Sequence, residues 1–429
     1  MGRAAARAAM LALAGTLAFA VAGCGTHRHS VALPGPALTI YTSLPLDAED
    51  GARAQDVAAA ERLALEQAGG RAGGFRIALV VLDDATTATG TWDPGLTQLN
   101  ARRAADDPTT IAYLGELSGG ASAISVPITN EAGILQLSPA DSLLGLTRNG
   151  GSPGEPERYY PTGQRTFARL VPSDEMQAEA ISRYMMAEHV RRLLVLDDQG
   201  NEGASLGLRV ARGAALHHID VVDLRAIDPH ATDFSSLAAS VAAAHVDAIC
   251  FAGDSTSMAP LLFNQLAAAD PSLRLFGSSG VDDATFAASL NPLAAQHTFL
   301  VSPALPQALW PSAGKAFAAA FYRRFGHNPD PYARYGFEAM RVVLAAITAA
   351  GPLGNGRAAV IGLVLGSRQH STVLGNYTID ADGDVSAAPF AGLRVRNGST
   401  VLSRLLSGSE ASRRKRSGLT RSAALQAAP

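Results

Sequence analysis

The chain has 429 residues, of which 47% are hydrophobic and 17% are charged, and its formal net charge is −3. This composition supplies enough apolar surface for a large folded core and excludes a disordered chain. The small negative charge argues against a nucleic-acid-binding protein. Two cysteines, Cys24 and Cys250, are too few for a disulfide framework or a cysteine-based metal site. The length suggests two domains or more.

Residues 1–23 have the layout of a secretory signal peptide: two arginines, a short apolar run (MLALAGTLAFAV) and then small residues. The apolar run is too short for a comfortable membrane span. The stretch Val21-Ala22-Gly23-Cys24 resembles the bacterial lipobox, which implies that Cys24 is lipidated and anchors the mature chain to the cell membrane outside the cytoplasm. An ordinary signal peptide with a chance cysteine is the alternative. Residues 24–37 are then expected to form a flexible tether.

In the first third of the body, apolar runs that read as strands alternate with helical segments. The strands are expected over 38–44, 75–84, 110–117 and 133–139, and the helices over 55–68, over 96–105 and directly after 117. Strands that are apolar on both faces and alternate with helices are typical of an open parallel sheet covered on both sides. This part of the chain therefore predicts an α/β unit.

The same alternation restarts after residue 170. Helices are expected over 174–188, 206–215 and 233–244, and strands over 191–198, 219–227, 246–254 and 272–280. A long apolar helix follows over 331–350, and 371–401 reads as a pair of hairpins. The DADGD stretch at 380–384 mimics a calcium loop but lacks the later ligands of an EF-hand, so a strand-connecting turn is the favoured interpretation. Two successive α/β units of similar size result.

Four of the predicted strands end in polar or very small residues: LGELSGG, LQLSPADS, CFAGDSTS and LFGSSGVDD. Ligands of open α/β sheets bind beyond the carboxyl ends of the strands. The stretch GELSGGASAISVP (115–127) places small residues at a helix N-terminus, where backbone amides favour an anion or carboxylate. A tight strand-to-helix turn would also explain its glycines. Two sheets that face each other across a cleft would bring these strand ends together.

No motif for covalent chemistry is present. The chain lacks a G-x-x-x-x-G-K-[ST] phosphate loop, a G-x-G-x-x-G after its first strand and an H-E-x-x-H motif. The GDSTS stretch at 253–257 is loosely similar to the start of a serine-hydrolase motif but lacks G-x-S-x-G, and no spacing ties Asp228 and His230 to Ser255. The sequence predicts a binding protein that is no enzyme and takes no metal or cofactor; a surface hydrolase using Ser255 is one alternative.

The segment ELSGGASAISVPITNEAGILQLSPA resembles the type I periplasmic binding proteins of the leucine/isoleucine/valine-binding family. Matches at IALVVLDDAT, TDFSSLAASVAAAHVDAICFAGD, PDPYARYGFEAM and LGNYTIDADGDV agree, so the resemblance covers roughly 38–405. It implies two Rossmann-like α/β lobes with parallel sheets, a small ligand bound between them, and delivery of that ligand to an ABC permease. A ligand-sensing module for a signalling partner is the other function that such a cleft could serve.

The resemblance also implies a three-segment hinge, with crossings near 168–172, 300–304 and 372–378. The implied parts are lobe 1 (38–170 and 303–373), lobe 2 (171–302 and 374–406) and a basic disordered tail (407–429).

In the family, the turn after the third strand and the loop after the fourth hold the ligand's α-carboxylate. The matching positions in this chain are Ser118, Gly119, Gly120, Ser138, Ala140 and Ser142. Backbone amides and hydroxyls suit a carboxylate, because charge-assisted hydrogen bonds are stronger than neutral ones.

Other positions depart from the family. Amino-acid binders carry an acid near position 279 that meets the ammonium group, whereas this chain has Ser279. Acids, namely Asp50, Glu202 and Asp254, stand where the branched-chain binders have aromatic residues in the cleft. They argue against a leucine-like side chain on the ligand: they would meet a cation or bond hydroxyls, unless the alignment slips and they are surface acids. The expected ligand is a small polar molecule with a carboxylate and an amine.

Overall fold

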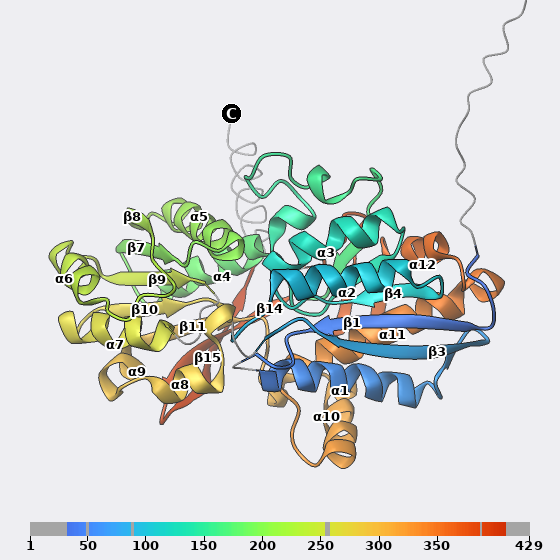
Figure 1. Ribbon diagram of the computed structural model, residues 1–429. Helices are drawn as coiled ribbons and strands as arrows, with labels where there is room; N and C mark the ends of the chain where they lie inside the picture. The colour runs from blue at the N-terminus through green and yellow to red at the C-terminus, as the bar shows by residue number, and fades with distance from the viewer. Residues whose placement is uncertain (1–31, 49–50, 87–89, 254–257, 387, 409–429) are drawn as a thin grey trace, which may run out of the picture.

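The computed structural model describes residues 32–48, 51–86, 90–253, 258–386 and 388–408, which form two α/β lobes lying side by side (Figure 1). Each lobe has its own central sheet with helices on both faces. No helix within these ranges is long and apolar enough to cross a membrane. Cys24, Asp50, Asp254 and Ser255 lie outside the described residues.

The sheet of lobe 1 has six strands in the order β2-β3-β1-β4-β5-β6, and all neighbours are parallel except β2 and β3. These strands are β1 (Ala37–Leu44), β2 (Arg71–Ala72), β3 (Phe75–Asp83), β4 (Thr110–Leu114), β5 (Leu135–Ser138) and β6 (Phe167–Arg169). Its helices are α1 (Gly51–Gln67), α2 (Pro94–Asp106), α3 (Gly119–Glu131), α10 (Ser312–Phe325), α11 (Ala333–Ala349) and α12 (Arg357–Val364). Helices α1 and α11 pack together on one face of the sheet, and α2 and α3 cover the other.

The sheet of lobe 2 has seven strands in the order β15-β14-β11-β10-β9-β7-β8. They are β7 (Arg192–Asp197), β8 (Asp220–Ala226), β9 (Ala248–Ala252), β10 (Arg274–Gly277), β11 (Thr298–Ser302), β14 (Pro389–Arg396) and β15 (Ser399–Ser407). Strands β7 to β11 run parallel, and β14 and β15 add an antiparallel edge. The helices are α4 (Asp174–Ala187), α5 (Asn201–Leu216), α6 (Ser235–Ala243), α7 (Ala259–Ala269), α8 (Ala284–Ser289) and α9 (Pro292–His297).

Three segments connect the lobes. The first joins β6 to α4 and the second joins β11 to α10. The third joins β13 to β14 and so lies later than the 372–378 expected from sequence. The reason is that β12 (Arg368–Thr372) and β13 (Gly375–Thr378) form a hairpin, and Val373 and Ile379 are buried in the core of lobe 1.

The DADGD stretch lies in this third crossing and forms a turn closed by a bridge between Ile379 and Val385. The guanidinium of Arg148 sits against its carboxylates, with Nη2 2.6 Å from Asp380 Oδ2 and Nε 2.7 Å from Asp384 Oδ2. No cluster of possible metal ligands occurs in the part of the chain that the structure describes. An arginine side chain therefore balances the acids of this turn.

The lobe 1 core contains a buried carboxyl group, that of Glu61 on α1, whose exposed fraction is 0%. Burial raises the pKa of Glu61 to about 8, against the smaller opposing effects of Thr42 and Arg62. The group is therefore protonated in the folded protein at neutral pH and ionised in the unfolded chain. Ionisation thus favours the unfolded state as the pH rises from 4.5 toward 8.

Replacing Glu61 by Gln is expected to stabilise the protein more at pH 8 than at pH 5. The variant keeps the shape of the protonated acid but cannot ionise, so the gain in free energy of unfolding grows by about 1.4 kcal/mol per pH unit and totals roughly 3 to 5 kcal/mol. Urea unfolding of the native protein and of Glu61→Gln at pH 5 and at pH 8 measures this gain. Glu66→Gln, on the exposed part of the same helix, is the control. An equal gain at both pH values would show that Glu61 ionises normally.

Candidate ligand-binding site at the lobe boundary

The site begins at the N-terminus of α3, directly after β4. Ser118 is the N-cap residue, and its Oγ accepts a hydrogen bond from the amide of Gly120 at 3.3 Å. A Cβ on Gly119 would lie 2.5 Å from Leu143 Cβ, and one on Gly120 would lie 2.6 Å from Trp92 Cζ2. The glycines are therefore required by close packing. They also leave the amides at the positive end of the helix accessible.

The loop after β5 supplies the second part of the site. The hydroxyl of Ser138 accepts from the amides of Ala140 (3.2 Å) and Asp141 (2.8 Å) and donates to the carbonyl of Glu116 (2.6 Å). These hydrogen bonds of Ser138 and Ala140 are internal to lobe 1 and shape the loop. Ser142 differs, because its hydroxyl reaches side chains of lobe 2.

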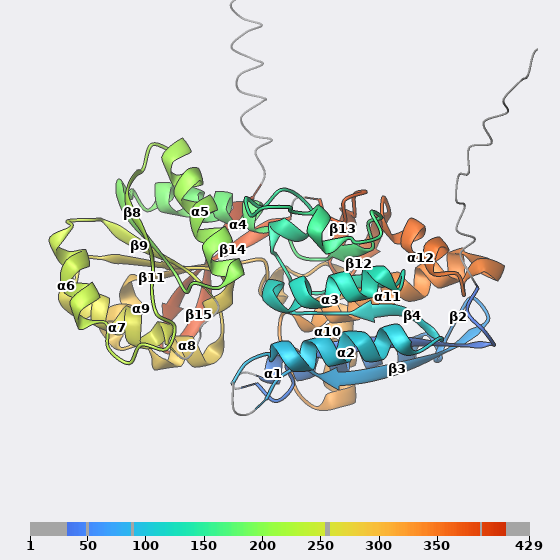
Figure 2. The ribbon, with the colours of Figure 1, turned by 45° about the horizontal axis from the view of Figure 1, so that its top comes forward.

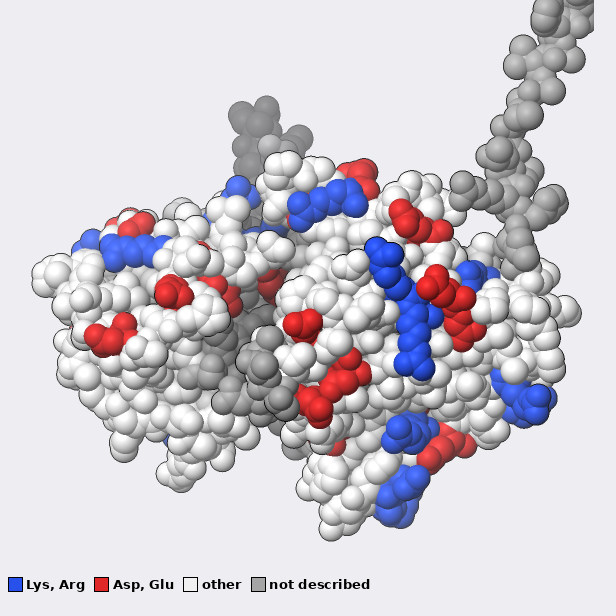
Figure 3. Space-filling view, viewed as in Figure 1, with Lys and Arg blue, Asp and Glu red and all other residues white. Residues whose placement is uncertain are grey.

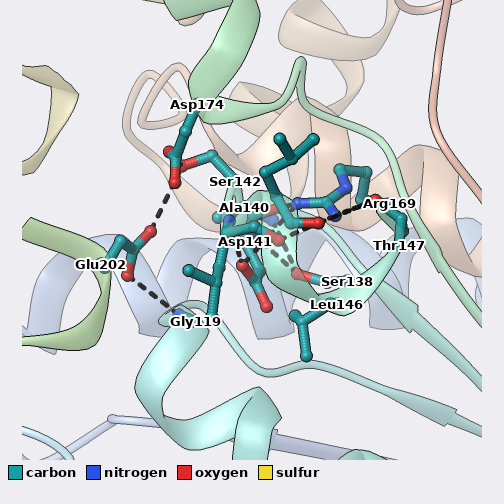
Figure 4. Close-up of polar contacts among 12 residues, drawn as sticks. Gly119, Ser138, Ala140, Asp141, Ser142, Leu146, Thr147, Arg169, Asp174 and Glu202 are labelled. Atoms are coloured by element: carbon teal, nitrogen blue, oxygen red, sulfur yellow. Dashed lines mark hydrogen bonds and ion pairs between the residues drawn. The ribbon is translucent and has the colours of Figure 1, made fainter. Parts of the chain in front are cut away.

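A buried arginine fixes this loop in place (Figure 4). Arg169, at the end of β6, is fully buried, and its guanidinium donates to the carbonyls of Asp141 (3.2 Å) and Leu143 (2.9 Å) and to Thr147 Oγ1 (2.8 Å). Its Nε lies 3.0 Å from Asp384 Oδ1 in the third crossing. Burial acts to raise the pKa of Asp384, but the positive charges of Arg169 and Arg148 prevail and hold it below its usual value. Asp384 is therefore ionised and paired.

Lobe 2 contributes a carboxylate to the same place. Glu202 lies in the first turn of α5, which begins at Asn201 and not at 206 as the pattern predicted. The amide of Gly119 donates to Glu202 Oε2 at 2.9 Å, and the hydroxyls of Ser118 and Ser142 lie 3.3 Å from Oε2 and 3.2 Å from Oε1. Figure 4 shows this carboxylate between the α3 turn and Ser142.

Asp174, the first residue of α4, completes the group. It is fully buried, and its Oδ1 lies 2.7 Å from Ser142 Oγ. Burial and the neighbouring charge of Glu202 raise the pKa of Asp174 well above its usual value. The Ser142 hydroxyl has one proton to give, and both Asp174 Oδ1 and Glu202 Oε1 lie within reach of it.

The remaining predicted residue lies elsewhere. Ser279 belongs to a short 3-10 helix of lobe 2 (Ser279–Val281), and its Oγ accepts from Gln177 Nε2 at 2.6 Å. The structure thus brings together Ser118, Gly119, Ser142 and Glu202, with Gly120 beside Trp92. Sequence reasoning missed Trp92, Arg169 and Asp174. An arginine inside the short apolar run TFARLV was the available signal for Arg169; Asp174 only looked like a residue of a helix start.

Figure 3 shows one face of the molecule, on which acidic side chains lie on both sides of the boundary between the lobes and basic side chains lie on both lobes.

Replacing Arg169 by Met is expected to lower the free energy of unfolding by about 3 kcal/mol, because buried carbonyls and Asp384 lose their partner. Arg148→Met removes the other arginine that contacts Asp384, but its side chain is 50% exposed, so a loss under about 1 kcal/mol is expected. Urea unfolding of both variants makes the comparison. Equal losses would mean that the buried guanidinium is not what fixes the loop.

Comparison with known proteins agrees with this architecture. The sequence profile of the family described as "Periplasmic binding protein" matches residues 44–398. An amino acid binding protein from Pseudomonas aeruginosa is 24% identical over 327 residues, which are 75% of this chain and 80% of that protein. Solved structures with the same fold include the following two. A leucine binding protein from Thermotoga maritima has a TM-score of 0.74 at 20% identity and covers 86% of this chain and 98% of its own.

The second structure is a solute binding protein of an ABC transporter from R. palustris in complex with benzoate, with a TM-score of 0.71 at 18% identity over 86% of this chain and 97% of that one. The family consists of extracytoplasmic solute-binding proteins that catalyse no reaction. Because the profile spans most of the chain and both lobes have the expected sheets, the protein belongs to the periplasmic binding protein family and has its type I fold.

Proposed function

We propose that this protein binds a small carboxylate-bearing solute, an amino acid or a related acid, between its lobes and presents it to an ABC permease. One observation carries the proposal: the α3 turn and Ser142 already hold a carboxylate, that of Glu202. The donors are one backbone amide and two hydroxyls, at the positive end of a 13-residue helix. A solute carboxylate would take the same donors, because they match its two oxygens and its charge.

The solutes of related proteins support this chemical class. Solved relatives include the leucine binding protein, the benzoate complex and a Streptococcus pneumoniae protein in complex with isoleucine. These solutes differ in their side chains but share a carboxylate. For this chain we infer that the solute carboxylate binds the donors that now hold Glu202, namely the Gly119 amide and the hydroxyls of Ser118 and Ser142, and we call these three donors the anchor. The rest of the solute would contact the side chains around the anchor. The aromatic ring of Trp92 packs against Gly120, beside that anchor.

An amine on the solute would need an acidic partner. Ser279 stands where the resemblance places the acid that meets an ammonium group, so that role falls to another side chain of lobe 2. Glu202 is an acid of lobe 2 that bonds directly to the Gly119 amide, whereas the other lobe 2 acid at the site, Asp174, is fully buried. Asp254 and Asp50 stay predictions for the same role. Closure of the lobes would then bring the acid of one lobe to a solute held by the other.

Ser118→Asp tests the anchor. An aspartate there would place a negative charge within reach of the solute carboxylate, so affinity should fall at least about tenfold, or about 1.4 kcal/mol. A thermal-shift screen with amino acids, benzoates, amides, polyamines and small peptides finds the solute, and calorimetry then measures affinity. Ser312→Asp, at the exposed start of α10, is the matched control and should bind as the native protein does. Native affinity in Ser118→Asp, with unchanged circular dichroism, would remove Ser118 from the site.

We also propose that Cys24 carries a lipid that anchors the protein to the membrane. Cells that express the chain and are fed a clickable palmitate analogue should yield a labelled, membrane-associated protein. Cys24→Ser should be unlabelled, because a hydroxyl does not replace the thiol in the lipobox. The buried Cys250 provides the control, since Cys250→Ser should keep the label. Retention of the label by Cys24→Ser would contradict lipidation at Cys24.

A further inference from the structure

We propose that Glu202 is a tethered competitor of the solute: its carboxylate occupies the anchor, must leave before a solute carboxylate binds, and so determines affinity and selectivity. The competition rests on the proposed function, since it assumes that the solute uses the same donors. The occupancy itself does not, because Glu202 already bonds to Gly119 and Ser142.

The anchor has room for one carboxylate. The Gly119 amide has a single proton, directed at Glu202 Oε2 at 2.9 Å, and the single proton of the Ser142 hydroxyl is already shared between Glu202 Oε1 and Asp174 Oδ1. A second carboxylate at this position would find no free donor. Two negative charges a few ångströms apart also repel each other, strongly so away from bulk water. Binding of Glu202 and binding of a solute carboxylate are therefore mutually exclusive.

Helix α5 holds Glu202 in position. Arg209 lies seven residues later, two turns along the helix and on the same face. Its Nη2 donates to the carbonyl of Gly150 in lobe 1 at 2.5 Å, and its Nη1 contacts Glu175 Oε2 at 2.7 Å. Figure 2 shows α5 at the lobe boundary, with its N-terminal end toward α3. The helix is thus docked at two points, and its docking gives the Glu202 carboxylate a high effective concentration at the anchor.

Selectivity follows from where the displaced carboxylate goes. A solute with a carboxylate alone must expel Glu202 and leave it beside a like charge. A solute that also carries an ammonium group offers the displaced Glu202 a partner. Glu202 therefore disfavours simple acids and favours amino acids. Removing its charge should improve the binding of simple acids most.

The test compares the native protein with Glu202→Ala and Glu202→Gln. The matched control is Glu188→Ala, which removes a glutamate whose partner, Arg404 at 2.8 Å, lies in the same lobe. Acetate is the first probe, because it needs only the vacated anchor. Acetate should raise the melting temperature of Glu202→Ala clearly more than that of the native protein or Glu188→Ala, and Glu202→Gln should be intermediate since its amide oxygen still accepts from Gly119. If Glu202→Ala fails to fold, Glu202→Gln alone carries the comparison.

Isocaproate and L-leucine, which differ by the α-ammonium group, are the second pair of probes. Calorimetry should show isocaproate bound about tenfold or more tightly by Glu202→Ala than by the native protein, with a smaller gain for leucine. Equal acetate responses in all variants would overturn the competition. An acetate response confined to the Glu202 variants, with no other acid and no amino acid binding any variant, would uphold the tethered carboxylate and overturn the proposed function instead.

Discussion

A single buried guanidinium joins two of the connections between the lobes to the candidate site. Arg169 ends the last strand of the lobe 1 sheet, where the first crossing begins, and it binds the carbonyls that shape the loop bearing Ser142. Through Asp384 it also reaches the third crossing. A buried arginine is tolerated only when its donors are satisfied, so the loop, the strand end and the crossing must all be in place together. The position of Ser142 is thus coupled to the geometry of these two crossings.

The anchor itself is made of neutral donors. The Gly119 amide, two hydroxyls and the helix terminus favour negative charge without presenting a formal cation. Two acids approach Ser142 from lobe 2, and burial and the charge of Glu202 raise the pKa of the fully buried Asp174. A raised pKa favours the neutral form of Asp174, and this lessens its repulsion with Glu202.

Much of the fold could be predicted from sequence, because each strand of a covered parallel sheet is a continuous apolar run. The turn at Ser118 to Gly120 could be predicted too, since small residues at a strand end mark close approach. The partner of that turn could not. It depends on where α5 begins and on how the lobes meet, and neither of these produces a periodic hydrophobic pattern in the sequence. The late third crossing was missed because the β12–β13 hairpin is held to lobe 1 by tertiary contacts that no local sequence pattern reveals, such as burial of Val373 and the hydrogen bond from Tyr377 to Glu338 on α11.

Helix α5 is a rigid connection between two contacts with lobe 1, at Gly119 and at Gly150. Glu202 and Arg209 are about 10 Å apart along its axis, and an α-helix does not stretch over that distance. A movement of the whole helix away from the α3 turn would therefore also disturb the buried contact between Arg209 and the Gly150 carbonyl. A rotation of the Glu202 side chain alone would free the anchor and leave that contact in place.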